Sequence, residues 1–515
     1  MLHEPGSSYK LPTEQLPADQ TVLSERREGE TALAFMRRRL AERGWLVPLL
    51  LFVAAAIVFS LFAWERVKKP STDPHFAYLA NTYNSMIAAK VGGEGSEAAK
   101  RREGKYPFEL DRKPPHRNDW ASWWELETRD GEQFRGIWLD KQGTGRFKTL
   151  DGKIVFLERS TLNHRERKQR YFMSFPPGPS VLMMPLAAVW GYQVNDVLFT
   201  IFFAALNVML MYILLRKLSV GGRSGRARDD NLWLTVLFGF GTVHLWTAVL
   251  GQVWFTALIV GLTFALLYIL CAIDAKHPFW AGLFLAMAFA TRTPLLFTCV
   301  FFFAFVFFPG GKWRKDDWPG AFKKLALFCA PCLVIGLSLL WMNAIRFESL
   351  SEFGHTYLAA GGLKRIQQYG LFNIHFLSKN LSAMLTLLPR FQPEAPFIVV
   401  SKHGMSMLLS TPVFFYLFMP EARESQQDKF WYRLLWGTVA VTALPGLFYQ
   451  NTGYAQYGFR FALDYMPYLI LILAVGRRPL SRLFKFLVLV GILVNAFGAV
   501  TFKRFEQFFS EDFFV

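Results

Sequence analysis

The sequence predicts an all-α polytopic membrane protein that carries a small β-rich insert in a long first external loop. Apolar residues make up 52% of the 515 residues, and the mean hydropathy is positive at +0.22. Roughly eleven apolar runs approach the ~20 residues that a helix needs to cross a hydrocarbon core. The net charge of +18 does not favour nucleic-acid binding, because the basic residues cluster beside apolar runs, where they set topology and contact anionic lipid head groups.

The predicted membrane-spanning segments are apolar and are flanked by basic or turn-forming residues. They lie at residues 45–64, 195–216, 231–250, 252–273, 278–290, 294–308, 325–345, 404–419, 432–449, 462–475 and 483–502.

The basic flanks predict the orientation of these segments, because Lys and Arg accumulate in cytoplasmic loops. The flanks fall on one side only if residues 178–192 do not cross, and this short, proline-rich stretch is better suited to a juxtamembrane or re-entrant helix. We therefore expect a multi-pass protein of the inner (plasma) membrane with a cytoplasmic amino terminus and an external, periplasmic active site.

The same patterns divide the chain into five parts. Residues 1–44 form a basic cytoplasmic tail, residues 45–64 the first transmembrane helix, and residues 65–194 an external loop. Residues 195–502 form the transmembrane bundle and residues 503–515 an external carboxyl-terminal tail.

The external loop is too long to be a passive connection. Residues 74–90 show helical spacing of apolar residues, which predicts a short helix on the membrane surface. Residues 91–118 are rich in Gly, Pro and charge and are expected to be flexible. Residues 119–160 contain short β-type runs separated by Asp-Gly and Gln-Gly turns, which predict a small antiparallel insert.

Four tryptophans of the insert allow two interpretations. Trp120, Trp123, Trp124 and Trp138 could stack on sugar rings, or they could fill the core of a small sheet or lie at the membrane interface.

Asp73, Pro74 and His75 stand together just after the first apolar run. An acidic N-cap followed by proline at the first helical position would explain the first two residues by structure alone. That interpretation does not account for His75, so catalysis at the outer membrane face is the alternative.

Several short motifs lie along the chain. Asp73-Pro74-His75-Phe76 follows the first apolar run, and YFMSFPPGP at residues 171–179 precedes the second. Further motifs stand at residues 281–294, 403–412 and 457–467. Together they resemble GT-C fold integral-membrane glycosyltransferases related to the polyprenyl-phosphate-dependent mannosyl- and aminoarabinosyltransferases.

This resemblance implies transfer of a sugar from a polyprenyl-phosphate donor to a glycan, lipid or protein acceptor on the external face, with the loop acid as base. Many members carry two adjacent acids in this loop, whereas Pro74 follows Asp73 here. A paired-carboxylate metal site therefore cannot be carried over, and no metal ligands are predicted. No cofactor is certain, although a diphosphate donor would favour a divalent metal.

Asp73 is thus the expected general base and His75 a group that orients it or the acceptor. Arg292 lies between two short apolar runs, and an arginine at membrane depth is a candidate for binding the lipid phosphate, unless it snorkels to the surface. The other candidate substrate-binding residues lie on the predicted external side. They are Tyr78, Arg365, Arg390, Lys402, His403 and Arg460.

Two other functions remain open. A flippase or transporter of lipid-linked sugars would place charges along helices at the bilayer midplane and show repeated halves. A ligase that transfers a whole glycan from a lipid diphosphate would use another external loop, such as residues 346–402.

Overall fold

The computed structural model describes residues 44–116, 118–140, 145–163, 167–358, 363–419, 421 and 425–513. The chain divides into two compact units, residues 1–50 and 51–515, and the second unit is described here by itself. Its described part is mostly helical and contains a five-stranded and a three-stranded sheet. The tail predicted for residues 1–44 lies almost entirely outside the described residues.

Five helices of the described chain are long and apolar enough to cross a membrane, and each coincides with a predicted span. With their terminal turns they are Leu46–Lys68, Asp196–Val220, Val253–Ala275, Trp318–Phe347 and Arg482–Thr501. The helices themselves are α2 (Leu46–Ala63), α6 (Asp196–Val220), α9 (Val253–Ala272), α12 (Trp318–Phe347) and α18 (Arg482–Thr501). They support a membrane protein, while the count of about eleven crossings and the orientation remain proposals.

The remaining predicted spans are shorter, more polar or interrupted. The bundle also contains α7 (Arg228–Phe240), α8 (His244–Ala248), α10 (Pro278–Phe289), α11 (Cys299–Phe307), α15 (Met407–Ser410), α16 (Gln426–Phe448) and α17 (Met466–Val475).

Two predicted spans are interrupted for identifiable reasons. Residues 231–250 fall on α7 and α8, and α7 ends where the Gly241 N–H donates to the Leu237 carbonyl at 2.8 Å. Residues 404–419 fall on α15 and the 3₁₀ helix η11 (Pro412–Phe418). Pro412 cannot donate a helical hydrogen bond to the preceding turn, so α15 stops before it.

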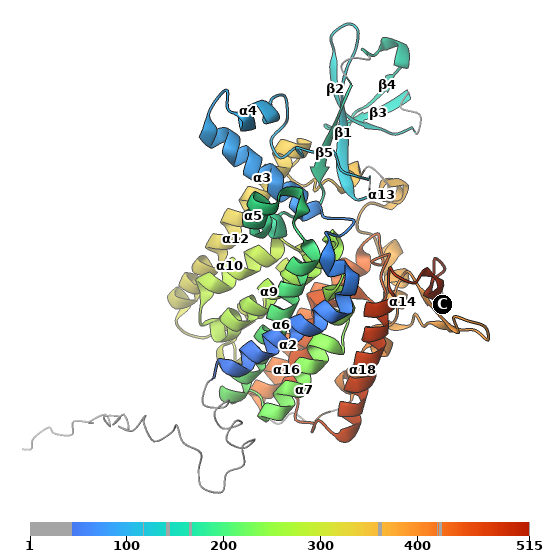
Figure 1. Ribbon diagram of the computed structural model, residues 1–515. Helices are drawn as coiled ribbons and strands as arrows, with labels where there is room; N and C mark the ends of the chain where they lie inside the picture. Colours follow the sequence, from blue (N-terminus) through green and yellow to red (C-terminus); the bar gives the residue numbers. More distant parts are fainter. Residues whose placement is uncertain are drawn as a thin grey trace, which may run out of the picture. The chain divides into compact units, whose positions relative to one another are not determined.

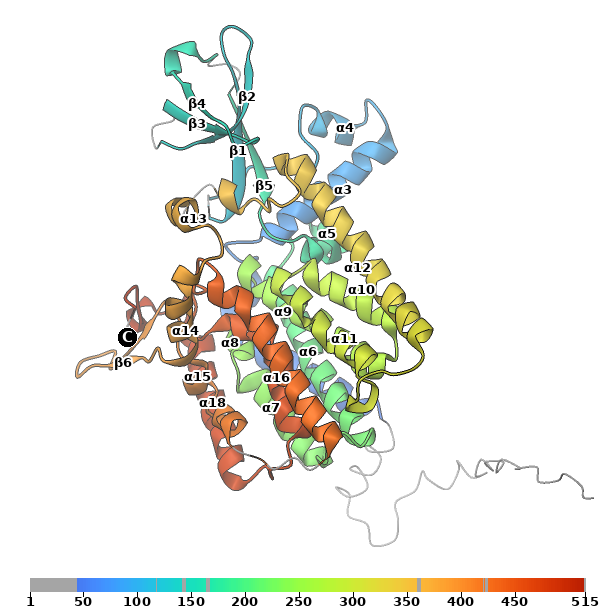
Figure 2. The same ribbon diagram turned by 180° about the vertical axis from the view of Figure 1, so that it is seen from behind.

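The helices of the bundle lie side by side (Figures 1 and 2). Their buried side chains form a continuous apolar core. α10 packs against α9 and α12, and α6 packs against α7 and α9. A Cβ atom on Gly282 of α10 would lie 2.0 Å from the Phe328 carbonyl oxygen of α12. Glycine is therefore required where these two backbones meet, as is common for helices packed in membranes.

The predicted insert is an antiparallel sheet with strand order β4-β3-β2-β1-β5. The strands are β1 (Trp120–Glu127), β2 (Gln133–Trp138), β3 (Gly145–Thr149), β4 (Ile154–Leu157) and β5 (Lys168–Met173). The sheet stands at one end of the bundle in both views (Figures 1 and 2). It extends beyond the expected residues 119–160, because β5 pairs with β1 from Trp120↔Met173 to Glu125↔Lys168.

Burial decides the role of two insert tryptophans. Trp120 and Trp123 are fully buried, and Trp124 and Trp138 are half-buried against a second small core. The sugar-stacking interpretation is therefore wrong for Trp120 and Trp123, which are core residues.

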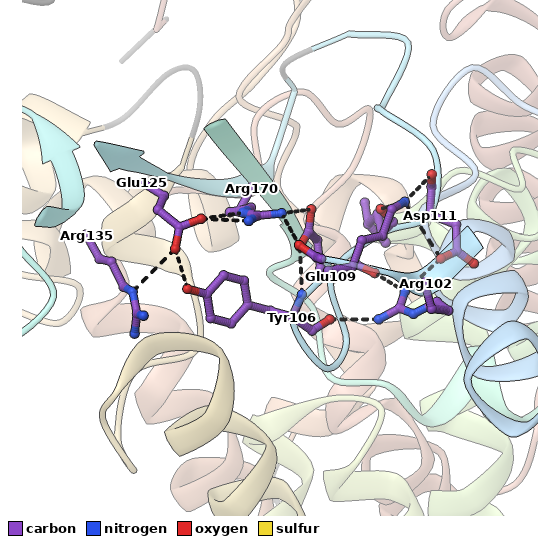
Figure 3. Close-up of polar contacts among 10 residues, drawn as sticks. Arg102, Tyr106, Glu109, Asp111, Glu125, Arg135 and Arg170 are labelled. Carbon is purple, nitrogen blue, oxygen red and sulfur yellow. Dashed lines mark hydrogen bonds and ion pairs between the residues drawn. The ribbon is translucent and has the colours of Figure 1, made fainter. Parts of the chain in front are cut away.

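The predicted flexible segment, residues 91–118, contains a helix and ion pairs. The helix is α4 (Glu97–Arg102), and Arg170 of β5 holds the segment to the sheet through Glu109 at 3.1 Å and Glu125 at 2.6 Å (Figure 3). Arg102 bonds Asp111 at 2.7 Å in the same network. A buried arginine needs paired carboxylates, so these ion pairs tie the chain near Glu109 to the sheet; the flexibility expected for residues 91–118 stays a prediction.

Two helices beside the insert match their predicted positions. They are α3 (His75–Gly92), expected at residues 74–90, and α5 (Gly178–Trp190), expected at residues 178–192, and they pack against each other. Val189 and Trp190 of α5 stay exposed, which suits helices that lie in a membrane interface.

Arg346, at the carboxyl end of α12, joins the bundle to the insert. Its Nη1 donates to the Met173 carbonyl at 2.7 Å, and its own carbonyl accepts from Trp123 Nε1 at 3.0 Å. One contact uses the Trp123 side chain of β1 and the other the carbonyl of Met173, the last residue of β5, so together they fix the position of both strands relative to α12.

The chain between α12 and α16 is held by the carboxyl-terminal tail. It contains α13 (Leu363–Tyr369), α14 (Leu377–Leu385), β6 (Arg390–Phe391) and β7 (Ile398–Ser401). β7 pairs antiparallel with β6 and parallel with β8 (Phe509–Ser510). The tail therefore supports loops that approach the cavity described next.

Candidate functional site

A cavity of about 840 Å³ lies where the insert meets the helical bundle. Its wall comes from the turn before β1, the segment 353–358 after α12, η7 (Thr293–Thr298), the carboxyl-terminal part of α16, and η12 (Arg460–Asp464). This volume is in the range of small-molecule sites, and the wall is mostly apolar with a few polar groups, as such sites usually are.

Asp119 is a carboxylate in this wall. It precedes β1 in a left-handed conformation (φ 52°), and its Oδ2 accepts a hydrogen bond from Trp254 Nε1 at 2.7 Å. Burial raises the pKa of Asp119, while the Trp254 bond and the nearby His355 and Arg460 oppose the rise. A carboxylate of increased basicity is suited to accept a proton.

His355 lines the same cavity. Burial lowers the pKa of its imidazole, and Asp119 and Glu352 act in the opposite direction. The ring is therefore neutral near pH 7 and can donate or accept one hydrogen bond to a bound molecule.

Arg292 lines the cavity with its charge already compensated. Its Nη2 lies 2.6 Å and its Nε 3.2 Å from the two carboxylate oxygens of Asp464. This two-bond geometry occupies one edge of the guanidinium, so Arg292 offers less charge to a ligand than the sequence suggested.

Arg460 is a buried cation of the cavity wall for which the structure gives no carboxylate ion pair among the described residues. Its Nε is buried without a hydrogen-bond partner, and its guanidinium lies over the Phe255 and Phe461 rings at 5.1 and 5.7 Å. Burial, followed by the nearby Arg292, lowers the pKa of Arg460 to about 9. Such a group is stabilised when an anion enters the cavity.

The apolar part of the wall reaches the surface of the helices. Leu296 and Phe297 of η7 and Leu444 of α16 line the cavity and are also exposed, at 37%, 44% and 45%. The cavity can therefore accept an apolar chain from the side of the bundle.

Asp73 is not among the residues that line this cavity. Its Oδ1 lies 3.2 Å from Asn118 Nδ2 and 3.4 Å from His116 Nε2, and its Oδ2 accepts from Thr72 and Gln252. Gln252 in turn accepts from Lys503 Nζ at 2.5 Å. Asp73 is 4% exposed. Its hydrogen-bond partner Asn118 directly precedes Asp119 in the chain.

The helix-capping interpretation of Asp73 is wrong. α3 begins at His75 with Pro74 as its N-cap, and no side chain caps it. The contacts of Asp73 instead join the chain just before α3 to His116, Asn118 and Gln252.

His75 and Tyr78 lie in the packed interface between α3 and the insert. The His75 ring stacks on Trp120 with centroids 3.7 Å apart, and its Nε2 is 3.0 Å from the Asn118 carbonyl. Burial lowers the pKa of His75 to about 4, so it stays neutral. Tyr78 packs against Trp120 and Tyr192. Neither lines the cavity, so their predicted roles in the site remain proposals.

The other predicted cations lie around the loops beside the cavity. Arg365 Nε donates to Gln450 Oε1 at 2.9 Å, and Gln450 lines the cavity. Lys402 pairs with Glu506 and Glu511, each at 2.9 Å. His403 Nδ1 is 2.9 Å from Thr452 Oγ1, and Arg390 is exposed in β6.

The structure thus brings Arg292 and Arg460 into one cavity and leaves the other predicted site residues outside its wall. Asp119, His355 and Asp464 were missed. Asp119 gave a weak signal as an acid before a β-type run, and Asp464 lies within the motif at residues 457–467 but was not selected, whereas His355 carried no motif. Within the described ranges, no group of three or more His, Cys, Asp or Glu side chains is arranged to hold a metal ion.

Comparison with known proteins identifies the family. A profile of glycosyltransferase family 87 matches residues 172–445, more than half of the chain. The matched region contains Arg292, His355 and most of α16, and so includes much of the cavity wall. No curated protein and no solved structure matches the chain. The chain belongs to glycosyltransferase family 87.

Proposed function

We propose that this glycosyltransferase moves a sugar from a polyprenyl-phosphate donor to an acceptor at the external face of the membrane, and that the transfer occurs in the cavity described above. The observation that carries the proposal is the composition of one cavity wall. It combines a buried arginine that no carboxylate of the described residues pairs with, a carboxylate of raised pKa and an apolar side that reaches the surface.

The apolar side suits the lipid chain of the donor. Phe297 and Leu444 would contact the isoprenoid as it enters between η7 and α16, because these side chains belong both to the cavity wall and to the exposed surface of the bundle. Burial of such a chain is favourable at about 25 cal/mol per Å² of apolar surface.

Arg460 is the proposed phosphate-binding residue. Its guanidinium fork matches phosphate oxygens, and its buried Nε has no partner in the structure. Arg292 is proposed as a second contributor through the edge that Asp464 does not occupy.

In the proposed step the acceptor oxygen attacks the anomeric carbon, and the bond from that carbon to the phosphate oxygen breaks. The electron pair leaves with the lipid phosphate, and the acceptor proton passes to a carboxylate as the new bond forms. Arg460 would stabilise the negative charge that develops on the leaving phosphate.

Two carboxylates are candidates to take the proton from the acceptor hydroxyl group. Asp119 is favoured because it lines the cavity and its pKa is raised. Asp73, the base expected from the sequence, already accepts hydrogen bonds from Thr72, Asn118 and Gln252. Its alternative role is to hold the Asn118–Asp119 turn in place.

The test is turnover in vesicles that contain a panel of polyprenyl-phosphate sugars, with the lipid products identified by mass spectrometry. Arg460→Gln should lower turnover by about 10- to 100-fold, the range for losing a charge-assisted hydrogen bond, and Arg460→Lys should lose less. Arg129→Gln on the exposed insert surface is the control. Full activity of Arg460→Gln would reject the phosphate role, and a lipid diphosphate product would favour a glycan ligase.

A further inference from the structure

Lys503 is a charged side chain beside the cavity that the proposed chemistry does not use. It follows α18 and has a left-handed backbone (φ 56°), which is uncommon outside glycine. Its neighbour Phe502 is 3% exposed and packs against the Phe255 ring at 6.3 Å. Its other neighbour, Arg504, donates from Nη2 to the Phe62 carbonyl of α2 at 3.0 Å. Contacts on both sides therefore fix the position of Lys503.

The amino group of Lys503 contacts three residues at the start of α9. Its Nζ donates to Gln252 Oε1 at 2.5 Å. The same nitrogen lies 5.2 Å from the centre of the Trp254 ring and 5.4 Å from the centre of the Phe255 ring. Lys503 as a whole is exposed, but Gln252 and Phe255 are only 6% and 0% exposed. Water therefore screens the charge at this end less than it screens a fully exposed lysine.

The amide of Gln252 connects Lys503 to Asp73. Its Nε2 donates to Asp73 Oδ2, while its Oε1 accepts from Lys503. A charged lysine offers only hydrogen-bond donors, and a carboxylate offers only acceptors. One of the two amide orientations satisfies both partners, and the reverse orientation satisfies neither. The charge of Lys503 thus selects the orientation in which Gln252 bonds the carboxylate.

The indole of Trp254 connects Lys503 to Asp119. Trp254 lines the cavity, and its Nε1 donates to Asp119 Oδ2 at 2.7 Å. A cation is attracted to the face of an indole ring, so the amino group of Lys503 stabilises the ring in this position. One lysine is therefore linked to both carboxylates that are candidates to take the proton.

Four charged groups from other parts of the chain surround this amino group. They are Asp73 before α3, Arg66 after α2, Arg460 of η12 and Glu506 in the tail. Burial lowers the pKa of Lys503 to about 8, Asp73 opposes the change, and Arg460 adds to it. Lys503 is thus mostly charged at pH 7 and loses its charge as the pH rises through about 8.

We propose that Lys503 is a positioning residue for sugar transfer, which orients Gln252 and Trp254 and thereby both candidate carboxylates. The proposal rests on the proposed function and deepens it, because it assigns a role in the same reaction. Lys503 does not line the cavity, so it acts through these two side chains and not on the substrate. Only the charged lysine selects the amide orientation described above, so turnover should fall on the alkaline side as well as on the acid side.

The first measurement is kcat/KM against pH for transfer from a polyprenyl-phosphate sugar by the full-length protein in vesicles. The wild type should lose activity as the pH rises through about 8. Lys503→Met should lower turnover at pH 7 by about tenfold, the scale for one charge-assisted hydrogen bond, and Lys503→Arg should keep most of it. In Lys503→Arg the alkaline loss should move up to about 9, where Arg460 is the next cation to lose its charge.

Lys485→Met is the matched control. Lys485 Nζ also lies over an indole, 5.6 Å from the centre of the Trp233 ring, and neither residue lines the cavity. This variant should keep the turnover and the alkaline loss of the wild type. A wild-type pH profile in Lys503→Met, or an alkaline loss that Lys503→Arg does not move, would overturn the proposal.

A second measurement does not depend on turnover. In protein labelled with 5-fluorotryptophan, the fluorine signal of Trp254 is assigned by its loss in Trp254→Phe. It should shift as the pH rises through about 8 in the wild type and show no such step in Lys503→Met. A signal that titrates equally in both proteins would reject the contact with Trp254.

The binding of farnesyl phosphate in phosphatidylcholine nanodiscs separates this proposal from the proposed function. Its affinity should be unchanged in Lys503→Met, which also shows that the variant is folded, and it should fall in Arg460→Gln. Transfer that depends on Arg460 but is indifferent to Lys503 rejects the positioning role alone. A Trp254 signal that depends on Lys503, with donor binding indifferent to Arg460, rejects the proposed phosphate role alone.

Discussion

Arg292 and Asp464 lie 172 residues apart in the chain and form a two-bond ion pair in the cavity wall. Arg292→Ala should lower the free energy of unfolding by about 3–5 kcal/mol, because it leaves the buried Asp464 carboxylate unpaired. Thermal unfolding of the detergent-solubilised protein checks this. Adding Asp464→Asn should recover part of the loss, and a single variant as stable as the wild type would contradict the structural role.

Variants of Arg292 also test whether this side chain takes part in catalysis. Arg292→Lys keeps a charge near Asp464 but loses the planar fork. If the free edge of Arg292 binds the donor phosphate, Arg292→Ala should weaken donor use more than Arg292→Lys does. Equal, full activity of the two variants would exclude a phosphate role.

The raised pKa of Asp119 predicts where activity is lost at low pH. Burial raises its pKa above the ordinary value of about 4, and a base must be deprotonated to act. Activity should therefore fall as the pH drops through this raised pKa, at a higher pH than for an exposed aspartate. The measurement is kcat/KM against pH, and an acid limb at or below pH ~4 would contradict Asp119 as the base.

At the scale of elements, the insert depends on Arg170. This side chain joins β5 to Glu109 and Glu125 (Figure 3), so Arg170→Gln removes the cation that the two carboxylates share. We expect residues 97–112 to become sensitive to limited proteolysis, with a local loss of about 3 kcal/mol. Arg146→Gln, on the exposed side of β3, is the control. Equal protection in both variants would show that the network does not hold this segment.

How far the sequence predicts each element depends on whether the cause is local. Apolar length predicts α6, α9 and α18 because a membrane span needs little else. Asp-Gly turns predict the first strands of the insert, but β5 depends on pairing with β1, in which Trp120 pairs with Met173, 53 residues later in the chain. Helix periodicity likewise cannot foresee that Pro412 and Gly241 divide two apolar runs.

The same reasoning explains the candidate site. Arg292 could be selected from the sequence because a cation near membrane depth is conspicuous, and Arg460 because it lies on the predicted external side. The pairing of Arg292 with Asp464 and the position of Asp119 in the cavity depend on contacts between distant segments. Asp73 attracted attention through its motif, whereas Asp119 is a single acid in a turn.

At the scale of the whole molecule, the orientation of the chain can be tested directly. With the four native cysteines replaced by serine, Lys153→Cys in the insert should react with a membrane-impermeant maleimide on intact cells. Lys315→Cys, in a predicted cytoplasmic flank, should react only after permeabilisation. Both side chains are exposed, so access to the side of the membrane decides the result. The reverse pattern would contradict the predicted orientation.

The account depends most on the claim that sugar transfer occurs in the cavity with Asp119 as the proton acceptor. The direct measurement is single-turnover transfer from a polyprenyl-phosphate sugar by Asp119→Asn and Asp73→Asn, with donor binding measured in parallel. The account predicts that Asp119→Asn still binds the donor but loses transfer by at least about 100-fold, the usual scale for a general base. It also predicts that Asp73→Asn keeps measurable transfer, since that residue would act by positioning. Full turnover by Asp119→Asn, with transfer abolished in Asp73→Asn, would contradict it.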